Sequence, residues 1–360
     1  MPENQLSLKK KLTLNVFRKY AKVQADIHEL SYLFWECTLR CNISCLHCGS
    51  DCQKDNKSRD MPYEPFLEVT RQVATKYNPN KTMIVITGGE PLLRKDLEKV
   101  GLGLYEQGFP WGFVTNGYAL TKERFRSLIN SGLRSITVSL DGFEEDHNWL
   151  RGRNDSFKKA INAIDLITKE PDLVYDVVTC VNQNNINKLH EFKNFLIERG
   201  VRKWRLFTIF PIGRAKDNPQ LNITNEQFKW IMQFIKDCRL EGEIIASYGC
   251  EGFLGTYENE VRDGFFLCRA GINIASVLAD GSIGACPNIN HSFIQGNIYD
   301  DDFLEVWENR FKNMRNRDWT KTGICENCDM FKYCRGNGMH LHEPNNPSVL
   351  RCHYNMLTGE

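Results

Sequence analysis

The chain has 360 residues, more than one hydrophobic core usually covers, so we expect a large domain joined to a smaller one. A net charge of +1, with 25% charged and 41% apolar residues, excludes a global field that would recruit nucleic acid or a membrane. No apolar run is long enough for a transmembrane segment and no cleavable signal peptide is visible, so we expect a cytoplasmic protein. In such a reducing compartment, the 14 cysteines are better explained by metal ligation than by disulfides.

Residues 1–30 are predicted to form a basic amphipathic helix. Five apolar residues recur at helical spacing, and six Lys or Arg residues occupy the remaining face; the apolar residues are Leu12, Val16, Phe17, Tyr20 and Val23. We expect the apolar side to pack on the domain that follows and the basic side to face solvent. Docking to a partner peptide or to an anionic membrane surface is the alternative.

From residue 31 to residue 241, strand-like and helix-like stretches alternate. The β-rich runs are 31–37, 82–87, 111–115, 135–140, 174–181 and 203–210. The amphipathic helical patterns are 63–76, 97–107, 121–131, 156–169, 186–198 and 225–241. This alternation is typical of an α/β fold with a parallel sheet and crossover helices. Since a complete barrel needs two more such units, we expect a partial (β/α)6 TIM-type barrel over residues 31–241.

Unusual residues collect where these strands end. Three cysteines follow the first strand, the run 88–91 follows the second, and Asn116 and Ser139 lie at the ends of the third and fourth. Because the carboxyl ends of parallel strands share one face of such a fold, sites are built there. We expect these residues to meet on one rim of the barrel.

The three cysteines, Cys41, Cys45 and Cys48, form a C-x-x-x-C-x-x-C run. Such a run can bind three irons of a 4Fe-4S cluster and leave the fourth iron open to a small ligand, whereas a fully ligated cluster is usually an electron carrier. Zinc is the competing interpretation, but zinc sites favour C-x-x-C pairs and four ligands. The flanking Cys37 and Cys52 are interpreted as bystanders, and the scattered Cys180 and Cys238 as ordinary core or surface residues. The pattern therefore indicates an enzyme rather than a non-catalytic metal-binding scaffold.

The run 35–48 resembles the cluster loop of the radical S-adenosylmethionine (SAM) enzymes, and the resemblance extends to about residue 240. Gly88, Gly89, Glu90 and Pro91 match the SAM-amine motif of that family in sequence and in place. The resemblance implies that SAM chelates the open iron and that one electron from the reduced cluster cleaves a carbon–sulfur bond. A 5′-deoxyadenosyl radical then abstracts hydrogen from a substrate.

Further contacts to SAM are expected from polar residues near the strand ends. Asn116 and Ser139 are candidates for the ribose or the carboxylate, and Arg151 is a candidate for the carboxylate. Asn116 and Arg151 have ordinary alternatives, because Asn116 begins a turn dipeptide and Arg151 could form a surface ion pair.

Residues 245–360 consist of short, glycine-rich, cysteine-bearing segments, and we expect metal binding to order them. Their cysteine spacing resembles the SPASM domain of radical SAM enzymes, a small cysteine-rich domain that usually holds two auxiliary 4Fe-4S clusters. The resemblance implies that one auxiliary cluster is bound by Cys325, Cys328, Cys334 and Cys352.

The ligand set of the other auxiliary cluster is incomplete in the sequence. The family pattern places a cysteine four positions after Cys334, where this chain has Gly338. The remaining candidates are Cys250, Cys268 and Cys286. Three thiolates would leave a vacant iron for a substrate thiolate, His340 or His342. Alternatively this cluster is absent and its cysteines bind zinc or nothing, so one or two auxiliary clusters are expected.

The two resemblances together imply an enzyme that modifies a peptide or protein substrate after translation, with an electron donor such as flavodoxin or ferredoxin. The run 35–52 also looks like a subgroup associated with small cysteine-rich lipoproteins. Radical oxidation or rearrangement of a small molecule, such as a tetrapyrrole, a sugar or an alcohol, is the alternative.

Overall fold

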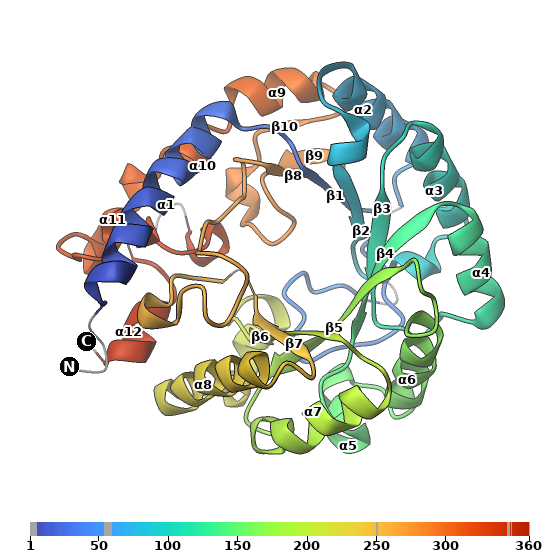
Figure 1. Cartoon of the computed structure of the whole chain (residues 1–360). Coiled ribbons are helices and arrows are strands. Elements are labelled where there is room, and N and C mark those ends of the chain that lie inside the picture. Colours follow the sequence, from blue (N-terminus) through green and yellow to red (C-terminus); the bar gives the residue numbers. More distant parts are fainter. Residues whose placement is uncertain (1–5, 54–59, 250, 344–345, 347, 360) are drawn as a thin grey trace.

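The computed structural model describes residues 6–359 apart from 54–59, 250, 344–345 and 347. Its sheet has ten strands in the order β10-β9-β8-β1-β2-β3-β4-β5-β6-β7. The strands are β1 Tyr32–Glu36, β2 Met83–Thr87, β3 Trp111–Thr115, β4 Leu133–Ser139, β5 Val174–Val181, β6 Lys203–Thr208, β7 Ile245–Tyr248, β8 Ile274–Val277, β9 Ser282–Gly284 and β10 Gly296–Asn297. Strands β1–β7 are parallel to their neighbours and are arranged around a common centre (Figure 1).

Helices cover the outer side of these seven strands (Figure 1). In chain order the α-helices of the described residues are α1 Leu8–Ile27, α2 Tyr63–Lys76, α3 Leu97–Glu106, α4 Lys122–Asn130, α5 Glu144–Arg151, α6 Ser156–Ile167, α7 Leu189–Glu198, α8 Asn225–Glu241, α9 Phe303–Asn309, α10 Lys312–Arg315, α11 Phe331–Cys334 and α12 His353–Thr358. Local signals explain several boundaries. Helix α8, for example, begins with a capping box between Thr224 and Gln227 and ends at Gly242, which adopts a positive φ of 76°.

The structure confirms the predicted partial barrel and adds one strand to it. Each of the six predicted strands is present, and β7 pairs in parallel with β6 as a seventh. Strand β7 has only four residues, of which Ala246 and Tyr248 are buried, so its sequence carries too short a pattern to be recognised. Helix α5 was also not predicted from the sequence.

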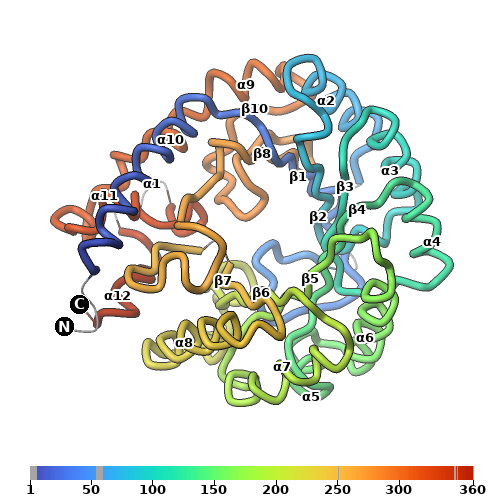
Figure 2. Tube along the Cα trace, viewed as in Figure 1, coloured from blue at the N-terminus to red at the C-terminus, as the bar shows by residue number. Residues whose placement is uncertain are grey.

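The C-terminal segment extends the same sheet rather than forming a separate one. Strand β8 pairs in parallel with β1, with Tyr32 opposite Ile274, and β9 and β10 continue the sheet in antiparallel pairs. Buried Trp307 of α9 belongs to the same apolar core as Leu33 and Trp35 of β1. Figure 2 shows this segment, in orange and red, on the side of the molecule away from β3 and β4.

Helix α1 packs on the C-terminal segment rather than on the barrel and uses only part of the predicted apolar face. Leu14 is buried against Phe253 and Phe266. Phe17 of the predicted face contacts Phe265 with ring centroids 5.3 Å apart, whereas Leu12 and Val16 are 59% and 69% exposed. The packing partner and most of the predicted face were wrong because the rings that receive α1 lie more than 200 positions along the chain, so the helix periodicity alone does not identify the buried face. In the described ranges, no helix has both the length and the apolarity needed to cross a membrane.

Candidate functional site

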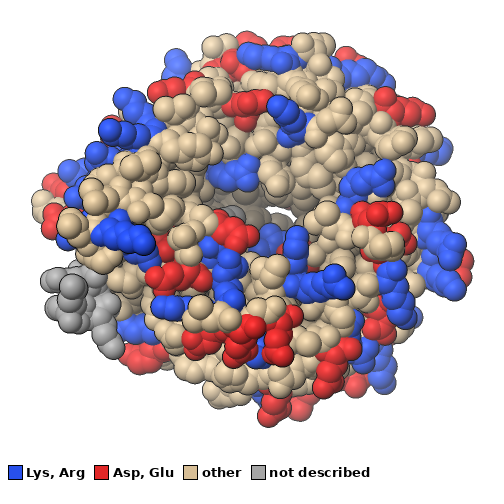
Figure 3. All heavy atoms as spheres, in the orientation of Figure 1, with Lys and Arg blue, Asp and Glu red and all other residues tan. Residues whose placement is uncertain are grey.

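The loop after β1 holds the three predicted cluster cysteines near the centre of the fold. Backbone hydrogen bonds fix both ends of this loop, from Cys37 N to Thr87 O at 2.9 Å and from Cys41 N to Gln53 O at 3.2 Å. Cys41 and Cys45 are buried in a small apolar cluster, against which the partly buried Cys48 packs. The loop therefore brings the three thiols to one place. Figure 3 shows that the face seen in Figure 1 is hollowed at its centre.

Two side chains donate hydrogen bonds to these sulfurs. Asn116 Nδ2 lies 3.8 Å from Cys41 Sγ, and Arg151 Nη1 lies 3.7 Å from Cys45 Sγ. Sulfur accepts such bonds best as a thiolate, which is the form that binds iron. The thiols that the structure brings together therefore fit the predicted cluster.

The protonation of the thiols depends on their surroundings. Burial raises the pKa of Cys41 to about 11 and also raises the pKa of Cys45. A hydrogen bond with Cys52 lowers the pKa of Cys48 and raises that of Cys52. Since metal ligands must be deprotonated, metal binding at this loop is expected to release protons. Cys52, predicted to be a bystander, thus contacts one of the candidate ligands.

The glycines of the run 88–91 let it pack against the cysteine loop. An ideal Cβ on Gly88, whose φ is +136°, would lie 2.3 Å from Thr38 O, and one on Gly89 would lie 2.2 Å from Arg40 O. The Gly89 N–H donates to Thr38 O at 2.7 Å. The sequence predicts a close approach of these glycines to a ligand, and the structure adds an approach to the cysteine loop itself.

The carboxylate of Glu90 joins the end of β2 to the end of β3. It is fully buried and accepts hydrogen bonds from Thr115 Oγ1 at 2.7 Å, Asn116 N at 2.9 Å and Leu92 N at 3.1 Å. Burial raises the pKa of Glu90, although these donors favour its charged form. Pro91 follows as the first residue of a short 3-10 turn. Glu90 is therefore a structural carboxylate within the predicted SAM-amine motif.

Asn116 and Ser139 lie on the rim as predicted from their positions at strand ends. The Asn116 side chain donates to Asn42 Oδ1 at 2.8 Å and accepts from Tyr118 N at 2.8 Å, which fixes its orientation toward Cys41. Ser139 is the last residue of β4 and is 9% exposed. Their predicted contacts to SAM stay predictions.

Arg151 is buried and paired rather than free. Its Nε donates to Asp141 Oδ2 at 2.6 Å, and Asp141 has no exposed surface. Burial disfavours the charged carboxylate, but Arg151, His47 and His147 outweigh this effect and lower the pKa of Asp141. Sequence reasoning did not identify Asp141, although its position directly after β4 is the signal by which the other rim residues were found.

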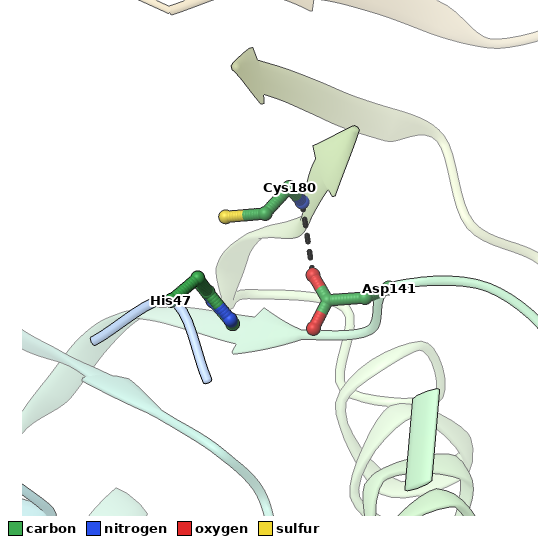
Figure 4. A group of neighbouring side chains, drawn as sticks. All are labelled: His47, Asp141 and Cys180. Carbon is green, nitrogen blue, oxygen red and sulfur yellow. Dashed lines mark hydrogen bonds between the residues drawn. The ribbon is translucent and has the colours of Figure 1, made fainter. Parts of the chain in front are cut away.

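His47, Asp141 and Cys180 form a compact group at the same rim (Figure 4). One potential ligand atom from each lies within 4.8 Å of the others. Asp141 Oδ1 also accepts a hydrogen bond from Cys180 N at 2.9 Å, and burial lowers the pKa of His47 to about 4, so the imidazole is neutral at pH 7. Sequence reasoning interpreted Cys180 as an ordinary residue, yet it lies near the end of β5 beside the cysteine loop.

The cysteines predicted for the complete auxiliary cluster lie near one another. Cys325, Cys328 and Cys352 pack in or against one apolar cluster. Burial is the main cause of the raised pKa of Cys334, and the nearby charges of Cys352 and Cys325 raise it further. Cys334 Sγ also accepts a hydrogen bond from Asn337 N at 3.2 Å. The four thiols are therefore near enough to influence one another electrostatically, as the predicted ligand set requires.

The cysteines predicted for the second auxiliary cluster flank the β8–β9 hairpin in sequence. Cys268 lies six residues before β8, and Cys286 lies two residues after β9. Cys268 Sγ accepts a hydrogen bond from Met339 N at 3.4 Å. Cys250 lies outside the described residues, so its predicted role stays a prediction.

Comparisons with known proteins match both halves of the chain. Residues 35–196 match the model of the Radical SAM superfamily, and residues 268–329 match the SPASM model, described as an iron-sulfur cluster-binding domain. The mycofactocin maturase MftC of Mycolicibacterium smegmatis is 28% identical over 318 residues, which cover 85% of this chain and 77% of that protein. The AdoMet-dependent heme synthase of Methanosarcina barkeri is 23% identical over 320 residues, 84% of this chain and 89% of that protein.

The fold also matches a solved structure. Streptococcus suis SuiB bound to its precursor peptide SuiA superposes with a TM-score of 0.70 at 17% identity, covering 97% of this chain and 82% of SuiB. At this identity the likeness establishes the fold.

Proposed function

Since this chain is a radical SAM enzyme that carries a SPASM domain, we propose that it modifies a peptide or protein substrate after translation. Its cofactors are the 4Fe-4S cluster and SAM used throughout this superfamily, together with auxiliary iron–sulfur clusters of the SPASM domain. When bound, the cluster and SAM supply the one-electron cleavage that starts radical chemistry. The observation that carries the radical SAM chemistry in this proposal is the three-cysteine loop packed against the ends of β2 and β3.

We assign Cys41, Cys45 and Cys48 as the ligands of the SAM-binding cluster. Asn116 and Arg151 would then stabilise two of the thiolates through their N–H donors. Hydrogen bonds to cluster sulfurs help to set the reduction potential, so both side chains are expected to tune electron transfer. Residues 31–241 would form this SAM-binding part of the chain, and the helix in residues 1–30 packs on residues 245–360.

SAM is proposed to bind along the same rim. The carboxylate of Glu90 is used within the protein, so the backbone carbonyls of Gly88 and Gly89 are left to accept hydrogen bonds from the SAM amine. Arg151 uses Nε and Nη1 in hydrogen bonds, whereas its Nη2 makes none among the described residues. Nη2 is therefore proposed as the donor to the SAM carboxylate. Ser139 is proposed for the ribose or the carboxylate.

Residues 245–360 are proposed to hold the auxiliary clusters. One would be bound by Cys325, Cys328, Cys334 and Cys352, whose thiols lie together. The other would use Cys268 and Cys286, with Cys250 predicted from the sequence alone. These clusters would accept or relay an electron during substrate oxidation, and the chain's initial electron is expected from a donor such as flavodoxin or ferredoxin.

Two similarities favour a peptide substrate. MftC is named a maturase, and SuiB was solved with a precursor peptide bound. The likeness of the run 35–52 to a subgroup associated with small cysteine-rich lipoproteins makes a cysteine-rich precursor the first peptide to test. Conversion of a tetrapyrrole is the second candidate, because heme synthases are relatives over 84% of this chain.

The test uses oxygen-free, reconstituted full-length protein, dithionite, SAM and short precursor peptides encoded beside its gene. We expect 5′-deoxyadenosine and a change of peptide mass with wild-type protein, and neither with Cys45→Ala. The matched control is Cys238→Ala, because Cys238 is a buried cysteine on α8 outside the site. Conversion of an iron porphyrin with no change in any peptide would replace this proposal by the second candidate.

A further inference from the structure

The position that lacks the expected cysteine is filled by a histidine ring. An ideal Cβ on Gly338 would lie 2.4 Å from His340 Cε1 and 2.7 Å from His340 Nδ1. The short turn Met339–Leu341, closed by a hydrogen bond from Leu341 N to Gly338 O at 3.0 Å, folds the ring back over Gly338. The imidazole therefore occupies the space that a side chain at position 338 would take.

The outer nitrogen of this ring is available as a ligand. His340 Nε2 is buried and has no hydrogen-bond partner among the described residues. Buried polar atoms are nearly always paired, so an unpaired one calls for an explanation. The ring is held in place by an edge-on contact with Phe210 at 4.7 Å between ring centroids. Burial also lowers the pKa of His340 to about 4, which keeps the imidazole neutral at pH 7, as metal ligation requires.

The turn that carries His340 lies beside one predicted ligand of the incomplete cluster. Met339, the residue before His340, donates its backbone N–H to Cys268 Sγ at 3.4 Å. The other candidate from the sequence, His342, is already engaged, because its Nε2 lies 2.6 Å from Gly336 O. Of the two Nε2 atoms, that of His340 is thus the one without a partner among the described residues.

We propose that His340 Nε2 replaces the missing cysteine thiolate as a ligand of the auxiliary cluster that contains Cys268 and Cys286. This inference rests on the proposed function of residues 245–360 as the auxiliary-cluster domain. A neutral imidazole in place of a thiolate makes the cluster less negative, which raises its reduction potential, as histidine ligation does in Rieske centres. The cluster would then be a better electron acceptor than one with four thiolates.

The test examines the auxiliary clusters without the SAM-binding cluster. In a full-length Cys41→Ala/Cys45→Ala/Cys48→Ala background, the protein is reconstituted, reduced with dithionite and studied by pulsed electron paramagnetic resonance. We expect a strong coupling to one directly bound nitrogen. In protein labelled with ¹⁵N-histidine, this ¹⁴N coupling should be replaced by a ¹⁵N coupling. This coupling should disappear in His340→Ala and persist in the matched control His342→Gln.

A second variant guards against loss of the fold. His340→Cys should keep about eight irons per chain, lose the nitrogen coupling and titrate at a lower potential. If the background protein holds about eight irons but shows no histidine coupling, the assignment of His340 is wrong while the auxiliary clusters stand. If it holds no iron and no sulfide, both the auxiliary-cluster domain and the role of His340 are refuted.

Discussion

Substitution of Gly89 by alanine tests the packing of the run 88–91 on the cysteine loop. The added Cβ would lie 2.2 Å from Arg40 O, 2.7 Å from Arg40 C and 3.2 Å from Cys41 Cβ. Real Cβ contacts stay above 3.0 Å, so the backbones at residue 89 and Arg40 must separate by at least 0.8 Å, which disturbs the neighbouring Cys41. Such overpacking costs about 1–3 kcal/mol of stability, and a misplacement of about 1 Å at a reacting centre can cost ~10²-fold in rate.

We therefore expect Gly89→Ala to form 5′-deoxyadenosine about 100-fold more slowly than wild type. The assay is chromatography of 5′-deoxyadenosine from anaerobic, dithionite-reduced protein, with iron measured on the same samples. The control is Gly49→Ala in the same loop, whose Cβ would meet Ile212 at 3.5 Å, an ordinary contact. Wild-type rates in Gly89→Ala would refute the steric argument, as would an equal loss in Gly49→Ala.

Three further substitutions test the electrostatics of the fold by chemical denaturation. The Glu90 carboxylate accepts three hydrogen bonds, whereas the amide of Glu90→Gln would point its own N–H group at one of the three donors. We expect the free energy of unfolding to fall by about 1–3 kcal/mol, and an unchanged value would contradict the role of the carboxylate. Arg151→Gln leaves the buried Asp141 carboxylate without its ion-pair partner, at a cost of about 3–5 kcal/mol. Adding Asp141→Asn should recover part of this loss, and additive losses would count against the pair. Hydrogen bonds to Lys76, Tyr77 and His28 outweigh burial and lower the pKa of Glu308 to about 2. Glu308→Gln should therefore lower the free energy of unfolding at pH 7, and this loss should shrink as the pH falls from about 4.5 toward 2. A loss of stability that does not depend on pH would contradict this.

The strand positions and the rim were predictable because both depend on local patterns. The run Met83–Thr87 alternates buried and partly buried residues, and the residues that follow it carry the turn chemistry of a strand end. Parallel pairing then brings the ends of β1 to β4 together whatever the details of packing. Cys41, Glu90 and Asn116 could thus be expected on one rim.

What could not be predicted depends on partners that are distant in sequence. The buried face of α1 is chosen by Phe253 and Phe266, and α1 itself is apolar on more than one side. The engagement of Arg151 with Asp141 and of Glu90 with Thr115 needs distances that the sequence does not contain. Cys180 was interpreted as an ordinary residue because it stands outside any cysteine motif, and only the register of β5 brings it to His47 and Asp141.

The central claim is that three thiolates hold the SAM-binding cluster and that its remaining iron is left for SAM. It is tested most directly by electron paramagnetic resonance of the dithionite-reduced protein, with the spectrum of the Cys41→Ala/Cys45→Ala/Cys48→Ala variant subtracted. The account predicts a cluster signal that shifts when SAM is added and acquires a coupling to ¹⁷O placed in the SAM carboxylate. A signal that neither shifts nor couples to the label would contradict it.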